Sequence, residues 1–87
     1  HADLRGADLT RANLTGADLR GADLCEAELV GANLTRADLR GASLYEADLS
    51  GACLTAAKLE KTDLREAELT PEQRVYAESQ GAMLYLN

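Results

Sequence analysis

The chain has 87 residues, with 15 acidic and nine basic side chains and a formal net charge of −6. This length makes one domain near the small end of what can bury a hydrophobic core, and the acidic balance argues against nonspecific binding to nucleic acid or anionic membrane. The 87 residues contain no signal peptide and no apolar run of membrane-spanning length. Any function therefore depends on how the side chains are patterned.

A leucine stands at every fifth position from Leu4 to Leu69, fourteen times in succession. The residue two positions earlier is alanine in thirteen of these repeats, with Thr62 as the exception. On an α-helix this period would spread the leucines around the circumference, and on a flat strand it would send them to alternate sides. A chain that bends once per repeat points every leucine inward, so residues 2–70 are predicted to form a solenoid.

The outward residues indicate how many repeats complete one coil. Between Arg11 and Val30, six of the twelve outward positions match the residue twenty positions later, against at most two at shifts of five, ten or fifteen. Four repeats per coil fit best and predict a square cross-section, although duplication of a twenty-residue gene segment would leave the same pattern. The alanines are expected to face a narrow axis, where a larger side chain overpacks the core.

The unbroken A-[D/N]-L-x-x pattern resembles that of the pentapeptide-repeat family over residues 2–70. The resemblance implies a right-handed quadrilateral β-helix, here of about 3.5 coils, so the predicted fold class is an all-β solenoid with a short C-terminal capping helix. Six glycines that follow a leucine by two positions are expected to supply positive φ at the corners. More than one turn type is expected, because the same position is also held by Arg11, Glu26, Arg36, Glu46 and Lys61.

One face of the predicted coil carries a carboxylate before each leucine, and the adjoining corner adds three more. Like charges about 5 Å apart in a column repel each other, so these residues are not placed there for stability. Three interpretations stay open: a solvated face, a docking surface for a basic protein partner, and a divalent-cation site. We call the seven residues the acidic stripe: Asp8, Glu26, Glu28, Glu46, Asp48, Glu66 and Glu68.

The other faces of the predicted coil differ in character. The third face is neutral, and its asparagines and threonines are expected to form ladders. Cys25 and Cys53 fall on different faces and point outward, so we expect two free thiols, which fit a reducing compartment. The fourth face is predicted to hold surface ion pairs of small value within three repeats: Asp18 with Arg20, Asp38 with Arg40, and Lys58 with Glu60.

Residues 71–87 form the second predicted segment, a capping helix and tail. Thr70, Pro71 and Gln73 are typical of a helix start, and Gly81 ends a helix of about residues 71–80. The helix is predicted to form a lid over the last coil, and a homodimer contact is the alternative. The apolar residues available to cover the coil are Val75, Tyr76, Ala77, Met83 and Leu84. The chain begins in mid-pattern without a cap, which predicts a fragment or an open end that stacks on a second copy, with His1 left over from a tag.

Few residues are available for catalysis. The one histidine is His1, so neither cysteine has an imidazole partner for nucleophilic catalysis. No Cys or His pair has zinc-ligand spacing, and no glycine-rich phosphate loop occurs. We expect no enzyme activity, cofactor or metal. The leading hypothesis is a noncatalytic structural or protein-interaction module, most typical of bacteria, with a protein partner rather than direct nucleic acid or membrane binding.

The alternative function follows from the family resemblance. Some pentapeptide-repeat proteins mimic DNA with an acidic rod, inhibit type II topoisomerases such as DNA gyrase and confer fluoroquinolone resistance. This chain is similar in its repeat, its acidic stripe and its C-terminal helix, but it is shorter and uses leucine alone where those proteins mix in phenylalanine. A stub of about 17 Å would imitate only about five base pairs. The expected compartment is the cytoplasm, with the periplasm or thylakoid lumen as alternatives.

Overall fold

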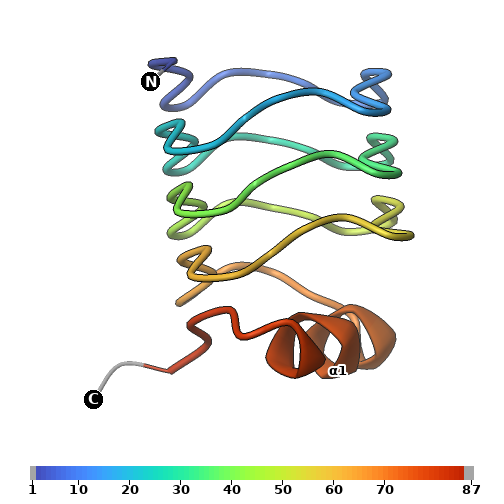
Figure 1. The fold of residues 1–87 in the computed structure, drawn as a ribbon. Coiled ribbons are helices and arrows are strands. Elements are labelled where there is room, and N and C mark those ends of the chain that lie inside the picture. The colour runs from blue at the N-terminus through green and yellow to red at the C-terminus, as the bar shows by residue number, and fades with distance from the viewer. Residues whose placement is uncertain (1, 86–87) are drawn as a thin grey trace.

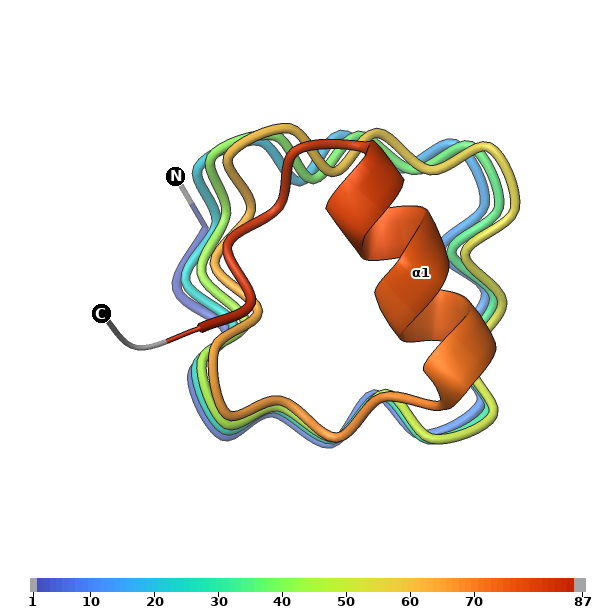
Figure 2. The ribbon, with the colours of Figure 1, turned by 90° about the horizontal axis from the view of Figure 1, so that it is seen from below.

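The computed structural model describes residues 2–85, which form a four-sided solenoid with one helix at its C-terminal end (Figure 1). Parallel bridges join residues twenty positions apart, for example Asp3 with Asp23 and Asp23 with Ser43. Four pentapeptides therefore make one turn, as the outward residues predicted, and Figure 2 shows the square outline. We number the faces in chain order: the first begins at residue 2, the second at 7, the third at 12 and the fourth at 17, and each recurs every twenty residues.

Each repeat bonds to the neighbouring coils through the same backbone groups. The Leu24 amide donates to the Ser43 carbonyl at 2.7 Å, and the Glu26 amide donates to the Tyr45 carbonyl at 2.8 Å. The Ser43 amide donates back to the Ala22 carbonyl at 2.9 Å. Because these backbone groups are paired between coils, the chain buries its interior without leaving them unsatisfied.

The corners repeat one tight turn. The Ala27 amide donates to the Leu24 carbonyl at 3.0 Å across two turn residues, and the second of these has the positive φ that a type II turn requires. That angle is 66° at Gly6 and 61° at Glu26. Glycine and larger residues thus adopt the same conformation, and the expectation of more than one turn type is wrong. Within residues 2–85, the non-glycine residues at positive φ are Arg11, Glu26, Arg36, Glu46, Ala56, Lys61 and Glu66.

The leucines and alanines fill the interior. Ala37 and Leu39 are fully buried, and the core extends from Leu19 to Leu64 and on to Ala77 and Leu84. Each buried leucine contributes on the order of 2 kcal/mol. Thr62 is also fully buried, and its hydroxyl donates to the Leu39 carbonyl at 2.6 Å. The one departure from alanine is therefore a polar side chain with a partner.

Helix α1 (Pro71–Ser79) begins where its start signal predicts. The Gln73 amide donates to the Thr70 hydroxyl at 3.2 Å, and the Thr70 amide donates to Gln73 Oε1 at 2.8 Å. This reciprocal pair is a capping box. The helix ends one residue earlier than predicted, with Gln80 as its C-cap and Gly81 at a φ of 84°.

Helix α1 crosses the end of the last coil (Figure 2). In the coils above it, carbonyls such as that of Ala32 accept a backbone amide from the next coil. The corresponding carbonyls of Ala52 and Ala57 accept side-chain groups of α1 instead, Gln73 Nε2 at 2.9 Å and the Tyr76 hydroxyl at 2.7 Å. Two side chains of α1 thus replace backbone donors of a further coil, which explains how the helix covers this end.

The chain returns to the first face after α1. Met83 bridges Asp63 in parallel and Leu84 is buried, so residues 82–84 add to the solenoid rather than forming only a tail. Ala77 and Leu84 cover the core as expected, but Val75 and Met83 are 68% and 45% exposed. The expectation is wrong for those two because Val75 lies on the outer side of α1 and Met83 takes the outward position before a leucine.

Candidate functional site: the acidic stripe and its surroundings

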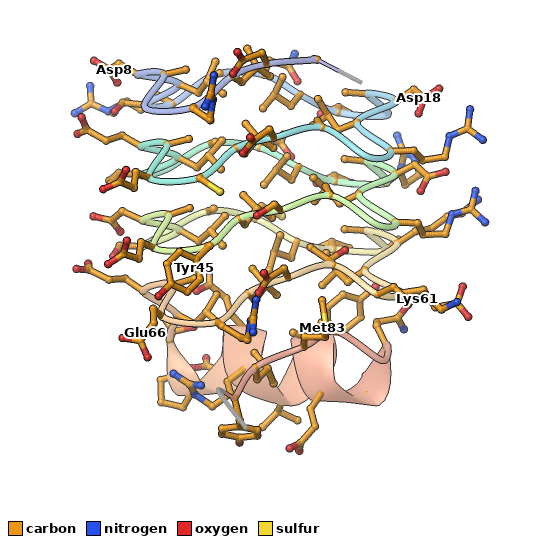
Figure 3. The ribbon with its side chains drawn as sticks, turned by 90° about the vertical axis from the view of Figure 1, so that its left-hand side faces the viewer. Asp8, Asp18, Tyr45, Lys61, Glu66 and Met83 are labelled. Carbon is orange, nitrogen blue, oxygen red and sulfur yellow. The ribbon has the colours of Figure 1, made fainter. Side chains whose placement is uncertain are left out.

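The structure brings the acidic stripe together on one edge of the solenoid. Bridges of Asp8 with Glu28, of Glu28 with Asp48 and of Asp48 with Glu68 stack four carboxylates on the second face. The three glutamates of the stripe at corner positions lie where the first face turns into the second, and Figure 3 shows Asp8 and Glu66 on the same side of the molecule. Six of the seven side chains are exposed, and Asp48 is half-buried.

Two aspartates of the stripe have local partners. Asp8 accepts the Thr10 hydroxyl at 2.6 Å and its amide at 3.1 Å, and Asp48 accepts the Ser50 hydroxyl at 2.6 Å and its amide at 3.0 Å. These two hydrogen bonds lower the pKa of each carboxyl below its ordinary value, and the bond from the hydroxyl has the larger effect. Both side chains are therefore ionised at neutral pH.

The bond from side chain to amide explains why Asp or Asn precedes the leucine. Within residues 2–85, no backbone carbonyl accepts the amide of the residue after a repeat leucine, and where Asp or Asn stands two residues earlier, its short side chain accepts that amide. Nine described repeats have this bond. This role was not predicted from the sequence, although Asx at a fixed distance before a turn is its recognisable signal.

This role separates the members of the acidic stripe. Among the described hydrogen bonds, none joins Glu28 to the Val30 amide, and none joins Glu68 to the Thr70 amide. The Thr70 amide donates to the Gln73 side chain instead. The three corner glutamates lie at positive φ, where glycine would avoid steric cost. The five glutamates are therefore not explained by the turn chemistry that accounts for Asp8 and Asp48.

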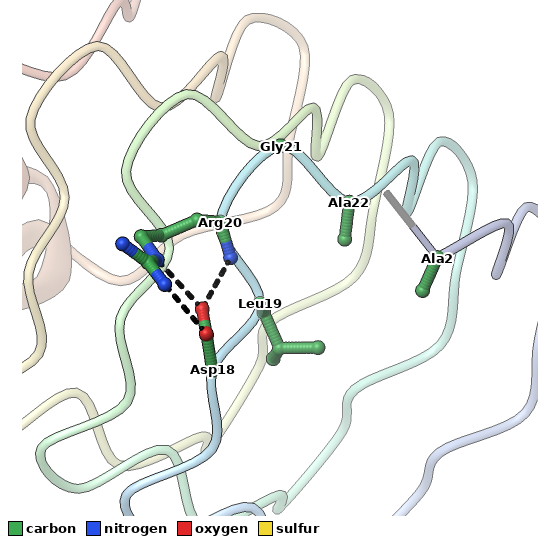
Figure 4. A pocket seen from close by; sticks show the side chains of 6 residues that line it. All are labelled: Ala2, Asp18, Leu19, Arg20, Gly21 and Ala22. Carbon is green, nitrogen blue, oxygen red and sulfur yellow. Dashed lines mark hydrogen bonds and ion pairs between the residues drawn. The ribbon is translucent and has the colours of Figure 1, made fainter.

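The fourth face holds the predicted Asp–Arg pairs. The Arg20 guanidinium donates to both Asp18 oxygens at 2.8 Å (Figure 4), and Arg40 donates to Asp38 at 2.8 and 2.6 Å. These bonds lower the pKa of Asp18 and Asp38 to about 2. The predicted Lys58–Glu60 pair is wrong, since no ion pair joins them among the described residues. The pair in Figure 4 borders a hollow at the first coil, between Ala2 and residues 18–22.

The first face has ion pairs that the sequence analysis did not predict. Arg5 pairs with Asp3 at 2.9 Å and Arg65 with Asp63 at 2.8 Å. The Arg65 guanidinium also lies over the Tyr45 ring, 5.8 Å from its centroid. Tyr45 thus contacts a charged side chain of its own chain.

The third face carries Cys53, which with Cys25 is a free cysteine. The Cys53 sulfur lies 3.3 Å from the Thr35 hydroxyl and 3.2 Å from the Thr55 hydroxyl. These contacts lower the pKa of the exposed Cys53 thiol to about 7. The expected ladder is only partial, because Asn33 accepts the amide and hydroxyl of Thr35 within its own repeat.

Within residues 2–85, no group of three His, Cys, Asp or Glu side chains is arranged to hold a metal ion, so the stripe does not converge on a cation site. His1 lies outside the described residues. No described helix is long and apolar enough to cross a membrane.

A four-sided solenoid with one pentapeptide per side defines the class of protein. The family model for pentapeptide repeats matches eight copies, over residues 2–41, 17–55 and 47–70. The chain therefore belongs to the pentapeptide-repeat family. No curated protein sequence matches it.

Three solved structures of pentapeptide-repeat proteins are similar to the chain. Rfr23 from the cyanobacterium Cyanothece 51142 is 32% identical, with a TM-score of 0.78, over 95% of this chain and 50% of that one. A protein from the Arabidopsis thaliana thylakoid lumen is 28% identical, with a TM-score of 0.50, over 95% and 75%. HetL from Nostoc sp. strain PCC 7120, described as involved in regulating heterocyst differentiation, is 43% identical, with a TM-score of 0.40, over 94% and 36%. The chain thus spans half the length of the Cyanothece protein.

Proposed function

We propose that the chain is a noncatalytic protein-interaction module that binds a basic partner through the acidic stripe. Its scaffold is a right-handed quadrilateral β-helix of about three and a half coils. The observation that carries the proposal is the uneven distribution of charge around this scaffold. The first and second faces hold ten acids against three bases, whereas the third and fourth hold three acids against five bases.

Such asymmetry favours one direction of approach. A concentrated negative potential steers a positively charged surface toward the first and second faces, and the weakly positive opposite faces repel it. The five glutamates support this proposal further, because the Asx bonds that stabilise the repeat do not account for them. The fold provides rigidity, so the carboxylates are held in place before a partner arrives.

The test is affinity capture with a charge-reversed variant. Glu28→Lys combined with Glu46→Lys changes two exposed residues of the stripe and leaves Asp8 and Asp48, with their local hydrogen bonds, in place. The control is Glu60→Lys with Thr15→Lys and Ala56→Lys, which makes the same change in net charge at exposed positions outside both the stripe and helix α1. A partner held by the native chain and the control, but lost from the stripe variant, supports the proposal. Equal recovery with both variants refutes it.

The DNA-mimic alternative is tested separately. The stripe spans three coil spacings of about 4.8 Å, or roughly 14 Å, which corresponds to about four base pairs. Inhibition of gyrase supercoiling by the native chain at micromolar concentration, with loss in the Glu28→Lys, Glu46→Lys variant, would support it. Absence of inhibition removes it.

We propose the cytoplasm as the compartment, on the basis of the two free cysteines. The similar Arabidopsis protein comes from the thylakoid lumen, so the lumen and the periplasm are the alternatives. Fractionation of native cells with an antibody to the chain distinguishes them.

A further inference from the structure

Helix α1 presents an apolar groove on its outer side. Pro71, Val75 and Tyr76 line it, together with Glu72 and Ser79. Val75 is 68% exposed, and the other large apolar side chains exposed in the described chain, Met83 and Tyr85, also lie at this end of the solenoid. A valine this exposed makes little contribution to the core that α1 covers, so packing within the chain does not explain it.

The charges around the groove distinguish between occupants. Glu72 lines it and forms no ion pair within residues 2–85, and Glu78 is exposed further along α1. In an antiparallel pair of α1 helices centred on Val75, Glu72 of each copy would face Glu78 of the other, which is repulsive. A second copy is therefore a poor fit, whereas a basic segment would supply the missing cations.

The groove also adjoins the acidic stripe along the chain. Glu68 is the last residue of the stripe, and Thr70 leads directly into Pro71 at the start of the groove. A partner steered by the stripe would therefore meet an apolar site at its C-terminal end. Charged residues chiefly set the rate and direction of encounter, while a buried apolar side chain supplies a large part of the affinity.

We propose that this groove binds a segment of a protein partner in which a large apolar side chain is flanked by lysine or arginine. This inference rests on the proposed function and adds which side chains of the partner bind in the groove. The apolar side chain packs against Val75 and Tyr76, and the neighbouring cation pairs with Glu72. The groove sets which basic segments bind, since a segment without the apolar residue gains only the charge attraction.

The probe is a short synthetic peptide with one tryptophan between four lysines. The protein contains no tryptophan, so tryptophan emission reports the peptide alone, and a blue shift reports its burial. In the matched control peptides, serine replaces tryptophan or glutamate replaces lysine. We expect a blue shift on binding, and at least tenfold weaker binding of both control peptides by fluorescence anisotropy.

Two variants place the peptide on the protein. Val75→Ser removes the apolar surface of the groove at an exposed position, and Ala56→Ser, at an exposed corner of the third face, is the control away from both the groove and the acidic stripe. We expect Val75→Ser to weaken binding about fivefold to tenfold, the effect of losing about one apolar side-chain contact, and Ala56→Ser to leave it unchanged. No blue shift, or equal affinity of the two variants, overturns the proposal. Circular dichroism confirms that both variants fold.

Glu28→Gln with Glu46→Gln separates this proposal from the proposed function. If this pair weakens peptide binding while Val75→Ser does not, the stripe binds basic segments and the groove does not. If only Val75→Ser weakens binding and the capture experiment shows no stripe-dependent partner, the groove stands and the stripe proposal fails.

Discussion

The side chain of Gln73 is expected to hold α1 on the end of the solenoid, so Gln73→Ala should be strongly destabilising. Gln73 is 8% exposed, and its amide donates to the carbonyls of Ala52 at 2.9 Å and Leu49 at 2.7 Å. Its carbonyl oxygen also accepts the Thr70 amide in the capping box. Removing the side chain breaks three hydrogen bonds at once.

The expected magnitude follows from what is left unpaired. The Leu49 carbonyl keeps the Ala52 amide at 2.9 Å, but no other described hydrogen bond reaches the Ala52 carbonyl, and such an orphan costs about 1–3 kcal/mol. Loss of the capping interaction adds about 1 kcal/mol. Gln73→Ala should therefore lower the free energy of unfolding by about 3 kcal/mol. Urea unfolding followed by far-UV circular dichroism measures it, with exposed Glu78→Ala as a control expected to stay within about 0.5 kcal/mol.

Gln73→Glu tests the same contact through the pH dependence of stability. Glutamate keeps an acceptor for the Thr70 amide but sets a carboxylate against two carbonyl oxygens, which raises its pKa in the folded state. The folded variant then binds a proton more tightly than the unfolded one, so its stability relative to the native chain should increase as the pH falls from 7 to 4. A Gln73→Ala loss below about 0.5 kcal/mol, or a Gln73→Glu stability deficit that does not change with pH, would refute the role assigned to this side chain.

Three further predictions concern the repeat itself. Gly41→Ala should lower the free energy of unfolding by about 1 kcal/mol, because φ is +71° there; the new Cβ meets nothing within 4 Å, so this backbone strain is the expected cause. Ala56→Gly relieves the same strain at a φ of 58° and should be neutral or stabilising. Equal effects of the two variants would contradict the turn assignment. Ala37→Leu should cost about 1–3 kcal/mol or more by overpacking a fully buried position, measured as a lower urea midpoint, and an unchanged midpoint would show that the axis is not tightly filled. The hydrogen bond from Arg40 lowers the pKa of Asp38 to about 2, so the stability that the ionised Asp38 adds to the fold is present above pH 4 and lost as the pH falls toward 2. Asp38→Asn should flatten the plot of unfolding free energy against pH between these two values. A plot identical to that of the native chain would exclude the Asp38–Arg40 pair as a cause.

The repeat pattern predicted the scaffold because every residue repeats the same local choice. A leucine every five positions, with alanine two before it, leaves few ways to bury all the leucines, and the period of twenty in the outward residues identified four repeats per coil. The column of Asp8, Glu28, Asp48 and Glu68 followed directly from that register. The start of α1 was also readable, since a capping box is a local signal.

The turn and ion-pair details were less predictable. Arg11 and Glu26 suggested a second turn type, but the backbone bonds of each coil impose one φ near +60° on both. Lys58 and Glu60 have the spacing of an ion pair without forming one, because a sequence spacing does not determine the rotamers of two exposed side chains. The bonding role of Asp and Asn before leucine became clear only when the unpaired amide of the turn was located.

The sequence by itself determined the inside of this protein and the list of residues on each face, because a strict period allows only one inward-facing set. The tertiary structure alone decided how the last coil ends. Gln73 and Tyr76 reach back to carbonyls about twenty residues earlier, Val75 is left facing outward, and residues 82–84 rejoin the first face. These contacts join segments that have no shared pattern, so their geometry depends on where a rigid helix crosses the square.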